Sequence, residues 1–221
     1  MTEKSYVEKL EAALAHILQP LKGVPFKVVV RTLANQVVIP IDRDSDDDCA
    51  LIAQLEKAIQ ACATELKQRP IQRPRPNEVG NDVEPYIMRA LKGVGYKVER
   101  PISRSGKGKA TGYPDILFYD IKDRPCYLEC KIYSDNTKQT TMRSFYLSPS
   151  DQFKVSIDAR HLLLSFEMER KPINGSSLSN FYPVAFNLVD LTELDCDMKY
   201  EFNADNHRLY NGKLVLLSGE C

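Results

Sequence analysis

The sequence predicts an α/β protein built on a mixed sheet, with a small N-terminal αββα domain ahead of a larger domain of the order αβββαβ. Three observations lead to this prediction. Apolar residues recur at helical spacing in separate segments, β-branched and apolar runs lie between turn residues, and a stretch rich in proline and arginine interrupts the pattern. The predicted domains therefore span residues 1–69 and 77–221, with a linker over residues 70–76.

The N-terminal domain is predicted to consist of two helices with a β-hairpin between them. Apolar side chains repeat every three or four positions from Val7 to Leu21, as in an amphipathic helix. Residues 26–32 and 37–41 are rich in β-branched side chains, which predicts the two strands of the hairpin. The aspartates at positions 44, 46, 47 and 48 resemble part of a calcium loop, but the segment lacks the glycine and distal glutamate of that motif. We therefore expect them to cap the helix that follows.

The larger domain is predicted to begin with a helix and to continue with apolar strands. The helix carries apolar positions from Val83 to Leu91 and ends at Gly93 and Gly95. The elements expected after it are strands over residues 96–100, 115–121, 126–133, 161–168 and 182–189, and a short helix over residues 149–158.

Composition places this chain among folded proteins without a membrane-spanning segment. Its 30 basic and 30 acidic side chains cancel, which excludes a protein that coats nucleic acid by bulk charge. Apolar residues make up 43% of the chain, as in ordinary globular proteins. No apolar run reaches the roughly 18 residues that span a bilayer, and the N-terminus lacks the apolar core of a signal peptide. We therefore expect a cytoplasmic protein with no membrane partner.

Cysteine and histidine do not show the spacing of zinc proteins. The six cysteines contain no CxxC pair, and the three histidines, His16, His161 and His207, lie far apart. We therefore expect reduced cysteines, and we expect carboxylates and lysines to carry any chemistry.

Two carboxylates and a lysine are predicted to meet at the sheet. Side chains alternate between faces along a strand, so Glu129 and Lys131 share one face. A turn centred on residues 122–125 would place Asp115 opposite about residue 132, close to both of them. Neighbouring carboxylates repel each other, and Mg²⁺, which prefers oxygen ligands, relieves that repulsion. A lysine beside metal-bound water can orient or deprotonate it.

The segments Pro114-Asp115 and Glu129-Cys130-Lys131 resemble the PD-(D/E)xK signature of the restriction-endonuclease-like nuclease superfamily. Many members of that superfamily carry a further glutamate on the helix that precedes the core, a few residues after a glycine. Glu84, four residues after Gly80, matches this feature of the superfamily, with Glu78 as the alternative. The resemblance covers about residues 77–168, in the family's αβββαβ order.

The resemblance implies a Mg²⁺-dependent nuclease that hydrolyses phosphodiester bonds of double-stranded DNA. It implies that Asp115 and Glu129 bind the metal, with the Cys130 carbonyl as a third protein ligand. Lys131 would position or activate the attacking water, and Glu84 would orient it or contact a second metal through water. The alternative without chemistry is that Asp115 caps a turn, while Glu129 and Lys131 form an ion pair on a solvated face.

A glycine-containing basic segment over residues 103–112 precedes Asp115. It lacks the spacing of a phosphate-binding P-loop, so we expect no nucleotide cofactor. Its cations are expected either to contact the DNA backbone or to form a solvated basic turn. These cations are Arg104, Lys107 and Lys109. Three later residues are predicted to extend the basic rim: Arg143, Lys154 and Arg160.

Among nucleases of this kind, a sequence-specific type II restriction endonuclease fits the sequence best, because the size is suitable and no helicase or ATPase motif is present. A single site cuts one strand, so double-strand cleavage predicts a homodimer, with the N-terminal domain serving dimerisation or clasping DNA. Two alternatives remain open. One is a structure-specific or repair DNA nuclease with the same site residues, and the other is a non-catalytic DNA-binding or assembly protein.

Overall fold

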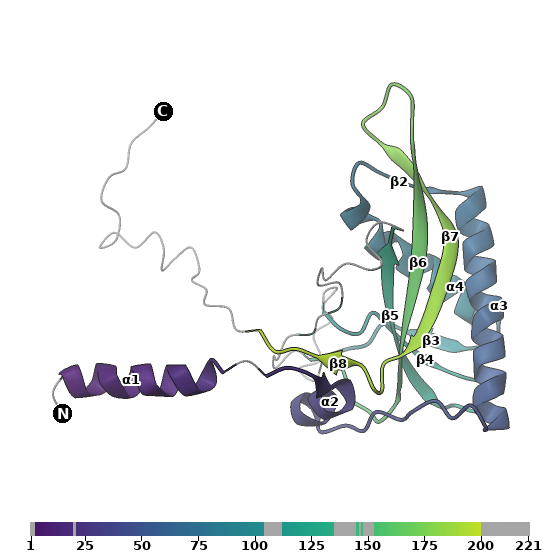
Figure 1. Ribbon diagram of the computed structural model, residues 1–221. Coiled ribbons are helices and arrows are strands. Elements are labelled where there is room, and N and C mark those ends of the chain that lie inside the picture. Colours follow the sequence, from purple (N-terminus) through teal and green to yellow (C-terminus); the bar gives the residue numbers. More distant parts are fainter. Residues whose placement is uncertain are drawn as a thin grey trace. The chain divides into compact units, whose positions relative to one another are not determined.

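A six-stranded mixed sheet forms the centre of the larger of two units into which the chain divides (Figure 1). The computed structural model describes residues 3–19, 21–103, 112–134, 145, 147 and 153–199. The larger unit spans Pro25–Leu194, and the smaller unit comprises Met1–Val24 and Asp195–Cys221. The α/β class and the mixed sheet predicted from the sequence are confirmed.

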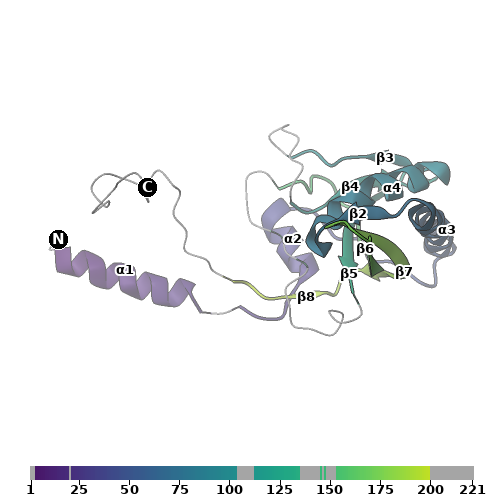
Figure 2. The ribbon, with the colours of Figure 1, turned by 90° about the horizontal axis from the view of Figure 1, so that it is seen from above.

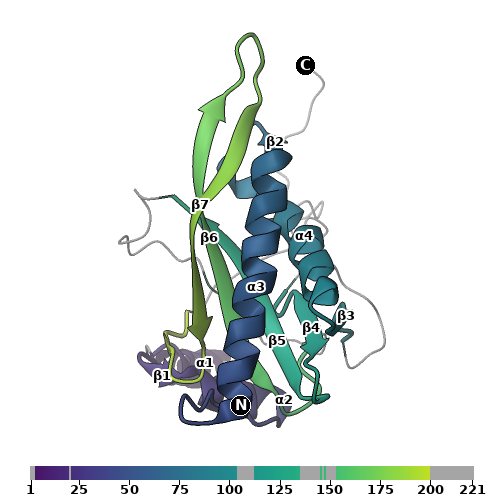
Figure 3. The same cartoon turned by 90° about the vertical axis from the view of Figure 1, so that its right-hand side faces the viewer.

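The strands of the sheet are β2 (Ile71–Arg73), β3 (Lys97–Glu99), β4 (Ile116–Tyr119), β5 (Pro125–Tyr133), β6 (Arg160–Pro172) and β7 (Ser179–Asp190). Their order across the sheet is β2-β7-β6-β5-β4-β3. β5 and β6 are parallel, and every other neighbouring pair is antiparallel. Because β5 and β6 are parallel, β6 and β7 continue as a hairpin past the carboxyl end of β5, as Figure 3 shows.

Two helices, α3 (Asp46–Gln68) and α4 (Gly80–Gly93), lie against one face of the sheet (Figure 3). Both helices present buried apolar residues to it, at the spacing of an amphipathic helix. Every second side chain of the central strands packs against these helices. The shared core includes Leu55, Ile59 and Cys62 of α3, Val83 and Ile87 of α4, and Leu128, Cys130, Leu164 and Phe166 of the sheet.

The opposite face is covered in part by a third helix, α2 (Phe26–Ala34), which lies across the sheet from α3 (Figure 2). Phe26 is fully buried, and its ring contacts the rings of Tyr113 and His161 edge-on, at centroid distances of 5.6 and 5.4 Å. Tyr127 of β5 belongs to the same apolar group, with its ring 5.0 Å from that of His161.

The predicted hairpin over residues 26–41 is wrong. Residues 26–34 form α2, and residues 37–41 contribute only an isolated bridge, from Val38 to Ala159. The β-branched residues of this segment favour a strand locally, but Phe26, Val30 and Ala34 recur every four positions and are all buried. Tertiary packing of this one stripe outweighs the local preference.

The proline- and arginine-rich segment 70–76 is part of the fold and not a free connector. Ile71–Arg73 forms β2, which pairs with the end of β7. Arg73 also binds Asp82 of α4 through two hydrogen bonds, of 2.6 and 2.8 Å. On the amino-terminal side of this segment, α3 packs in the same core as α4. The division between compact units falls elsewhere, at residues 24/25 and 194/195.

Strand register differs slightly from the prediction. Ile116 pairs with Leu128, so that Asp115 falls level with Glu129 and not with residue 132. The cause is the turn between β4 and β5, in which the Asp120 carboxylate accepts the backbone amides of Lys122 and Arg124. Elsewhere, the described part of the helix predicted over 149–158, from Phe153 onward, is irregular.

The smaller unit contains α1 (Glu3–Ile17) and a short pairing between β1 (Val24–Pro25) and β8 (Asp195–Cys196). Two further hydrogen bonds join its segments: Asp197 accepts the Gly23 amide, and Leu21 accepts the Met198 amide. Apolar side chains of α1 are exposed, including those of Val7, Leu10 and Ile17 at 45, 46 and 53%. Within the described residues, no helix combines the length and the apolar character that crossing a membrane requires.

Candidate active site

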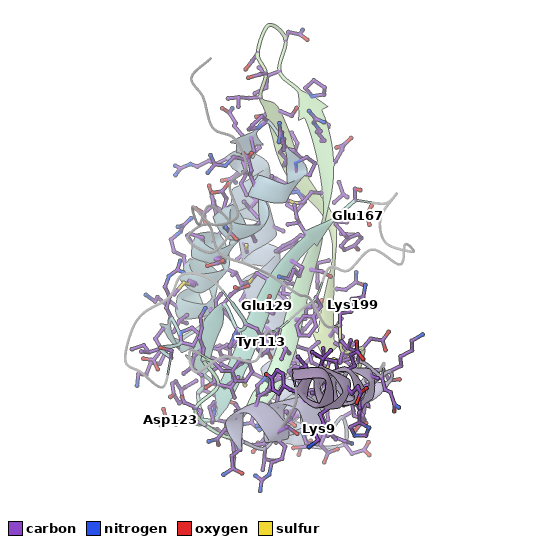
Figure 4. The ribbon with its side chains drawn as sticks, turned by 90° about the vertical axis from the view of Figure 1, so that its left-hand side faces the viewer. Lys9, Tyr113, Asp123, Glu129, Glu167 and Lys199 are labelled. Carbon is purple, nitrogen blue, oxygen red and sulfur yellow. The ribbon has the colours of Figure 1, made fainter. Side chains whose placement is uncertain are left out.

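The candidate site lies on the face of β5 that points away from α3 and α4. Alternation along β5 sends Leu128 and Cys130 into the core beneath those helices. Glu129 and Lys131 therefore project from the opposite face, on which Figure 4 labels Glu129 and Tyr113. A single strand thus contributes both to the core and to the site.

Asp115 joins this group from the residue just before β4. Because β4 begins at Ile116, the backbone of Cys130 extends past the end of its antiparallel neighbour. The Asp115 carboxylate takes the place of the missing strand, and its Oδ2 accepts the Cys130 amide at 2.9 Å. This hydrogen bond fixes the carboxylate of Asp115 beside the segment that carries Glu129 and Lys131.

Glu129 is buried in a position that opposes its negative charge. The residue is 3% exposed, and its Oε1 lies 2.6 Å from Nζ of Lys131. Burial, together with the charge of Asp115, raises the pKa of Glu129 to about 7, although Lys131 acts in the opposite direction. Its other oxygen, Oε2, is buried and has no hydrogen-bond partner among the described residues.

Glu84 approaches the same site from α4. It is 7% exposed, and its Oε2 accepts a hydrogen bond of 3.1 Å from Arg100. Burial and the charge of Asp115 raise the pKa of Glu84, and Arg100 lowers it in part. The helix begins at Gly80 without a side-chain hydrogen bond at its cap, so Glu84 does not serve to cap it. Glu84 instead faces the acidic site.

Lys154 is the cation on the other side of this group. It is 4% exposed, and its Nζ donates to the carbonyl oxygens of Gly112 and Pro114, at 2.7 and 3.1 Å. The prediction that Lys154 and Arg160 extend an exposed basic rim is therefore wrong. Arg160 is also largely buried, and its guanidinium binds Asp48 at 2.8 Å. Arg143 lies outside the described residues.

The segment that carries Asp115 is also anchored from the side of α2. The Tyr113 hydroxyl is hydrogen-bonded to Nδ1 of His161, at 2.6 Å. His161 is fully buried, and burial lowers its pKa to about 3. The neutral imidazole therefore serves as a fixed hydrogen-bonding partner for Tyr113 over the whole physiological pH range.

The donors present suit a hard divalent cation. In the part of the chain that the structure describes, no group of three or more His, Cys, Asp or Glu side chains is arranged to hold a metal ion, which leaves the pair Asp115 and Glu129. Mg²⁺ needs only one or two protein carboxylates, because it keeps several waters. The buried Glu129 oxygen without a partner, next to a second carboxylate, is the observation that fits such an ion.

The structure brings four of the predicted site residues together: Glu84, Asp115, Glu129 and Lys131. The predicted DNA-contacting residues Arg104, Lys107 and Lys109 lie outside the described residues. Sequence reasoning missed Arg100 as the partner of Glu84, and it misplaced Lys154 on the surface. Both lie in stretches without a motif, although the apolar neighbours Phe153 and Val155 were a signal that Lys154 is buried.

Comparison with known proteins assigns the chain to a family. The chain matches the family model described as the type II restriction enzyme MjaV family over residues 20–213. It is 35% identical to the type II restriction enzyme MjaV of Methanocaldococcus jannaschii over 231 aligned residues, which cover 98% of this chain and 97% of that enzyme. No solved structure matches the chain. Since both matches span nearly the whole sequence, including the acidic site, the chain belongs to the type II restriction enzyme MjaV family.

Proposed function

We propose that this protein is a Mg²⁺-dependent type II restriction endonuclease, which hydrolyses phosphodiester bonds of double-stranded DNA at a specific sequence. Family membership supports the reaction class. The single observation that supports the site is the buried Glu129 carboxylate, which lies beside Asp115 with one oxygen lacking a partner among the described residues. A bound divalent cation supplies the charge that this pair lacks and lowers the pKa of a bound water.

Asp115 and Glu129 are the proposed metal ligands, together with the Cys130 carbonyl. In an extended strand, the N–H and C=O groups of one residue point to the same side. The Cys130 amide points to the Asp115 carboxylate, so its carbonyl is directed to the same edge. Three oxygens from two strands would then face one position, with room for water and phosphate to complete the coordination.

Lys131 and Glu84 have proposed roles in handling water. Lys131 is 30% exposed at its side chain, so its ammonium group can reach both Glu129 and a water next to the ligands. There it would orient that water or offset charge on the phosphate as the bond breaks. Glu84 lies near Asp115, where it would hold a second water, with Arg100 fixing its orientation.

The fold supports the restriction-endonuclease-like core proposed from the sequence. The order α4, β3, β4, β5 and then β6 parallel to β5 agrees with the αβββαβ order, except that no helix lies in the described residues between β5 and β6. The acidic residues cluster where β4 begins and where β5 passes it. The basic segment with Arg104, Lys107 and Lys109 leads into this position, and we propose that it contacts the DNA backbone.

A homodimer is proposed, because one site per chain cuts one strand. The exposed side of α1 is the proposed contact with a second copy. Val7, Leu10, Leu14 and Ile17 repeat at alternating steps of three and four, the spacing of helices that pair in coiled coils. Clasping of DNA by the N-terminal segment and a cytoplasmic location stay predictions.

Digestion of DNA tests the proposed function. Purified protein is incubated with DNA of mixed sequence, with and without Mg²⁺, and the ends of the products are sequenced. We expect Mg²⁺-dependent cleavage at one recurring sequence, lost in Asp115→Asn. Cleavage confined to branched or damaged DNA would point to a repair nuclease. Absence of cleavage with every divalent ion, together with mere loss of stability in Asp115→Asn, would refute the catalytic proposal.

A further inference from the structure

We propose that Lys154 is a positioning residue of the metal site, whose ammonium group sets the place of the Asp115 carboxylate by holding the backbone on both sides of Pro114. The inference rests on the proposed function, since it concerns the same metal site. Lys154 lies outside the sequence signature. In the described structure its hydrogen bonds go to backbone carbonyl oxygens and not to Lys131 or Glu129.

The hydrogen bonds of Lys154 act on the backbone directly next to Asp115. The Pro114 carbonyl, 3.1 Å from Nζ, belongs to the peptide group that joins Pro114 to Asp115. The Gly112 carbonyl, 2.7 Å from Nζ, lies in a turn whose φ of +95° favours glycine. Two fixed carbonyls therefore define the path of the chain into Asp115, and a shift of Nζ would shift that carboxylate.

Other contacts hold the neighbouring groups but leave this peptide to Lys154. The Tyr113 hydroxyl is bound to His161, and the Asp115 carboxylate accepts the Cys130 amide. These two hydrogen bonds hold the side chains of Tyr113 and Asp115, and neither of them holds the peptide group between Pro114 and Asp115. Among the described residues, the Pro114 carbonyl has its hydrogen bond from Lys154.

The position of Lys154 is itself rigid. Its neighbours Phe153 and Val155 are 6 and 0% exposed, so the stem of the lysine leaves a packed segment. A buried lysine is costly unless acceptors and opposite charges surround it. Here two carbonyl oxygens accept hydrogen bonds from its ammonium group, and the charges of Asp115, Glu129 and Glu84 favour its charged form. A neutral donor could also bind the two carbonyl oxygens, but the three nearby carboxylates favour a positively charged donor at this position.

Two roles for this cation predict opposite effects on metal binding. A lysine that only adds positive charge near the ligands would repel Mg²⁺, so its removal would tighten metal binding. A lysine that positions Asp115 would have the reverse effect, because its removal lets a ligand move. Loss of the groups that orient a metal ligand commonly weakens metal affinity by about 10- to 100-fold. The sign of the change therefore separates the two roles.

The experiment compares Lys154→Met with Lys154→Arg. Methionine keeps most of the volume and removes the donors, while arginine keeps charge and donors at a different reach. For each variant, Mg²⁺ is titrated against the initial cleavage rate and, separately, against the midpoint of thermal unfolding, which bound metal raises. We expect Lys154→Met to need at least about tenfold more Mg²⁺ in both titrations, with most of the rate recovered at saturation. Lys154→Arg should lie between Lys154→Met and the parent.

Arg124→Met is the matched control, because Arg124 is a cation in the same larger unit, 20% exposed at its side chain, that binds Asp48 and Asp120 and no residue of the metal site in the described structure. It should lower the unfolding temperature and leave the Mg²⁺ requirement unchanged. An unchanged or lowered Mg²⁺ requirement in Lys154→Met, or in Lys154→Arg if the methionine variant does not fold, would overturn the inference. Failure of the proposed function gives a different result, in which the parent protein itself shows no Mg²⁺-dependent cleavage and no thermal shift.

Discussion

Glu129 has an environment that stabilises its protonated form as long as no metal is bound. It is buried, it lies beside Asp115, and the cation that it contacts, Lys131, is 30% exposed at its side chain. In a protein without a metal, such a residue lowers the free energy of unfolding at neutral pH. A residue that costs stability and gains its partner only from a ligand is typical of an active site.

We expect Glu129→Gln to stabilise the metal-free protein while abolishing cleavage. The pKa of Glu129 rises from 4.5 in the unfolded chain to about 7 in the fold. Between these values the unfolded chain has released the proton and the folded one has not, so the parent loses stability as pH rises through this window. The stability gained by the variant should therefore be small below pH 4.5 and reach about 3 kcal/mol above pH 7 at about 1.4 kcal/mol per unit.

Denaturant unfolding at several pH values, in a chelator, measures this effect. Asp115→Asn is the control, since it removes the neighbouring charge and should shrink the same pH dependence. A Glu129→Gln variant that is less stable than the parent at every pH would contradict the conclusion that burial and the charge of Asp115 destabilise the ionised Glu129.

Lys131 is expected to behave differently from Lys154. Replacing Lys131 by Met should lower the cleavage rate at saturating Mg²⁺ by about 10²- to 10⁴-fold, as for loss of a group that handles a proton. The concentration of Mg²⁺ that gives half the maximal rate should change little, because Lys131 binds one side-chain oxygen of Glu129 and leaves the other oxygen to the metal. Titration of the cleavage rate with Mg²⁺ measures both quantities. A Lys131→Met variant that reaches the maximal rate of the parent, but only at high Mg²⁺, would contradict this prediction.

The residues of the site could be predicted to the extent that they follow a local rule. Alternation along one strand places Glu129 and Lys131 on one face, and pairing of two strands brings Asp115 to them. The register was off by three residues, because the side chain of Asp120 shapes the turn between the strands. Lys154 could not be assigned from the sequence, since its partners are backbone carbonyls some forty residues earlier.

At the scale of elements, a buried ion network joins the start of α3 to the turn between β4 and β5. Asp48 is 1% exposed, and its carboxylate binds Arg124 at 2.6 Å, Arg160 at 2.8 Å and the Asp42 amide at 2.9 Å. Burial raises the pKa of Asp48, but the amide and the two arginines outweigh it and hold the pKa below 3.8. The acidic cluster therefore serves as more than a cap for the helix.

We expect Asp48→Asn to lower the free energy of unfolding by about 3 kcal/mol at neutral pH, because it removes the charge partner that the largely buried Arg160 has in Asp48 and one of the two carboxylates that bind Arg124. The difference from the parent should disappear as pH falls through the region below 3.8, where Asp48 itself becomes protonated. Urea unfolding at pH 7 and at acidic pH measures this. A loss that stays constant with pH would show that the charge of Asp48 contributes nothing.

Elements with a long, regular apolar pattern were predictable, and those decided by distant packing were not. α3, α4 and the central strands have a periodicity that matches one face of the core. In α2 the β-branched residues favoured a strand, and the burial of one stripe, in which Phe26 packs against Tyr113 and His161, favours the helix. For β2, the prolines nearby suggested a linker, whereas its partner β7 lies far along the chain.

At the scale of the whole molecule, the proposed homodimer makes cleavage of both DNA strands depend on association of two copies. The apolar side of α1 is exposed, with Leu10 and Ile17 near half exposure. A pair of such helices would bury these side chains, at about 25 cal/mol for each Å² removed from water.

We expect the parent protein to be a dimer and the double variant Leu10→Glu/Ile17→Glu to be a monomer that retains its fold. Light scattering after size-exclusion chromatography measures the mass, and circular dichroism checks the fold. A supercoiled plasmid should then be nicked before it is linearised. Substitution of Lys9 and Glu11 by Ala is the control and should leave the mass unchanged. A monomeric parent that linearises plasmid in one step would contradict this.

The two faces of β5 limit how the protein can change. Leu128 and Cys130 anchor the strand among the helices, while Glu129 and Lys131, which alternate with them, project from the opposite face. Inserting or deleting one residue within the strand would turn the acid inward and the apolar neighbours outward. Variation that preserves both folding and activity must therefore occur by substitution along this strand, while changes of length are confined to the loops around it.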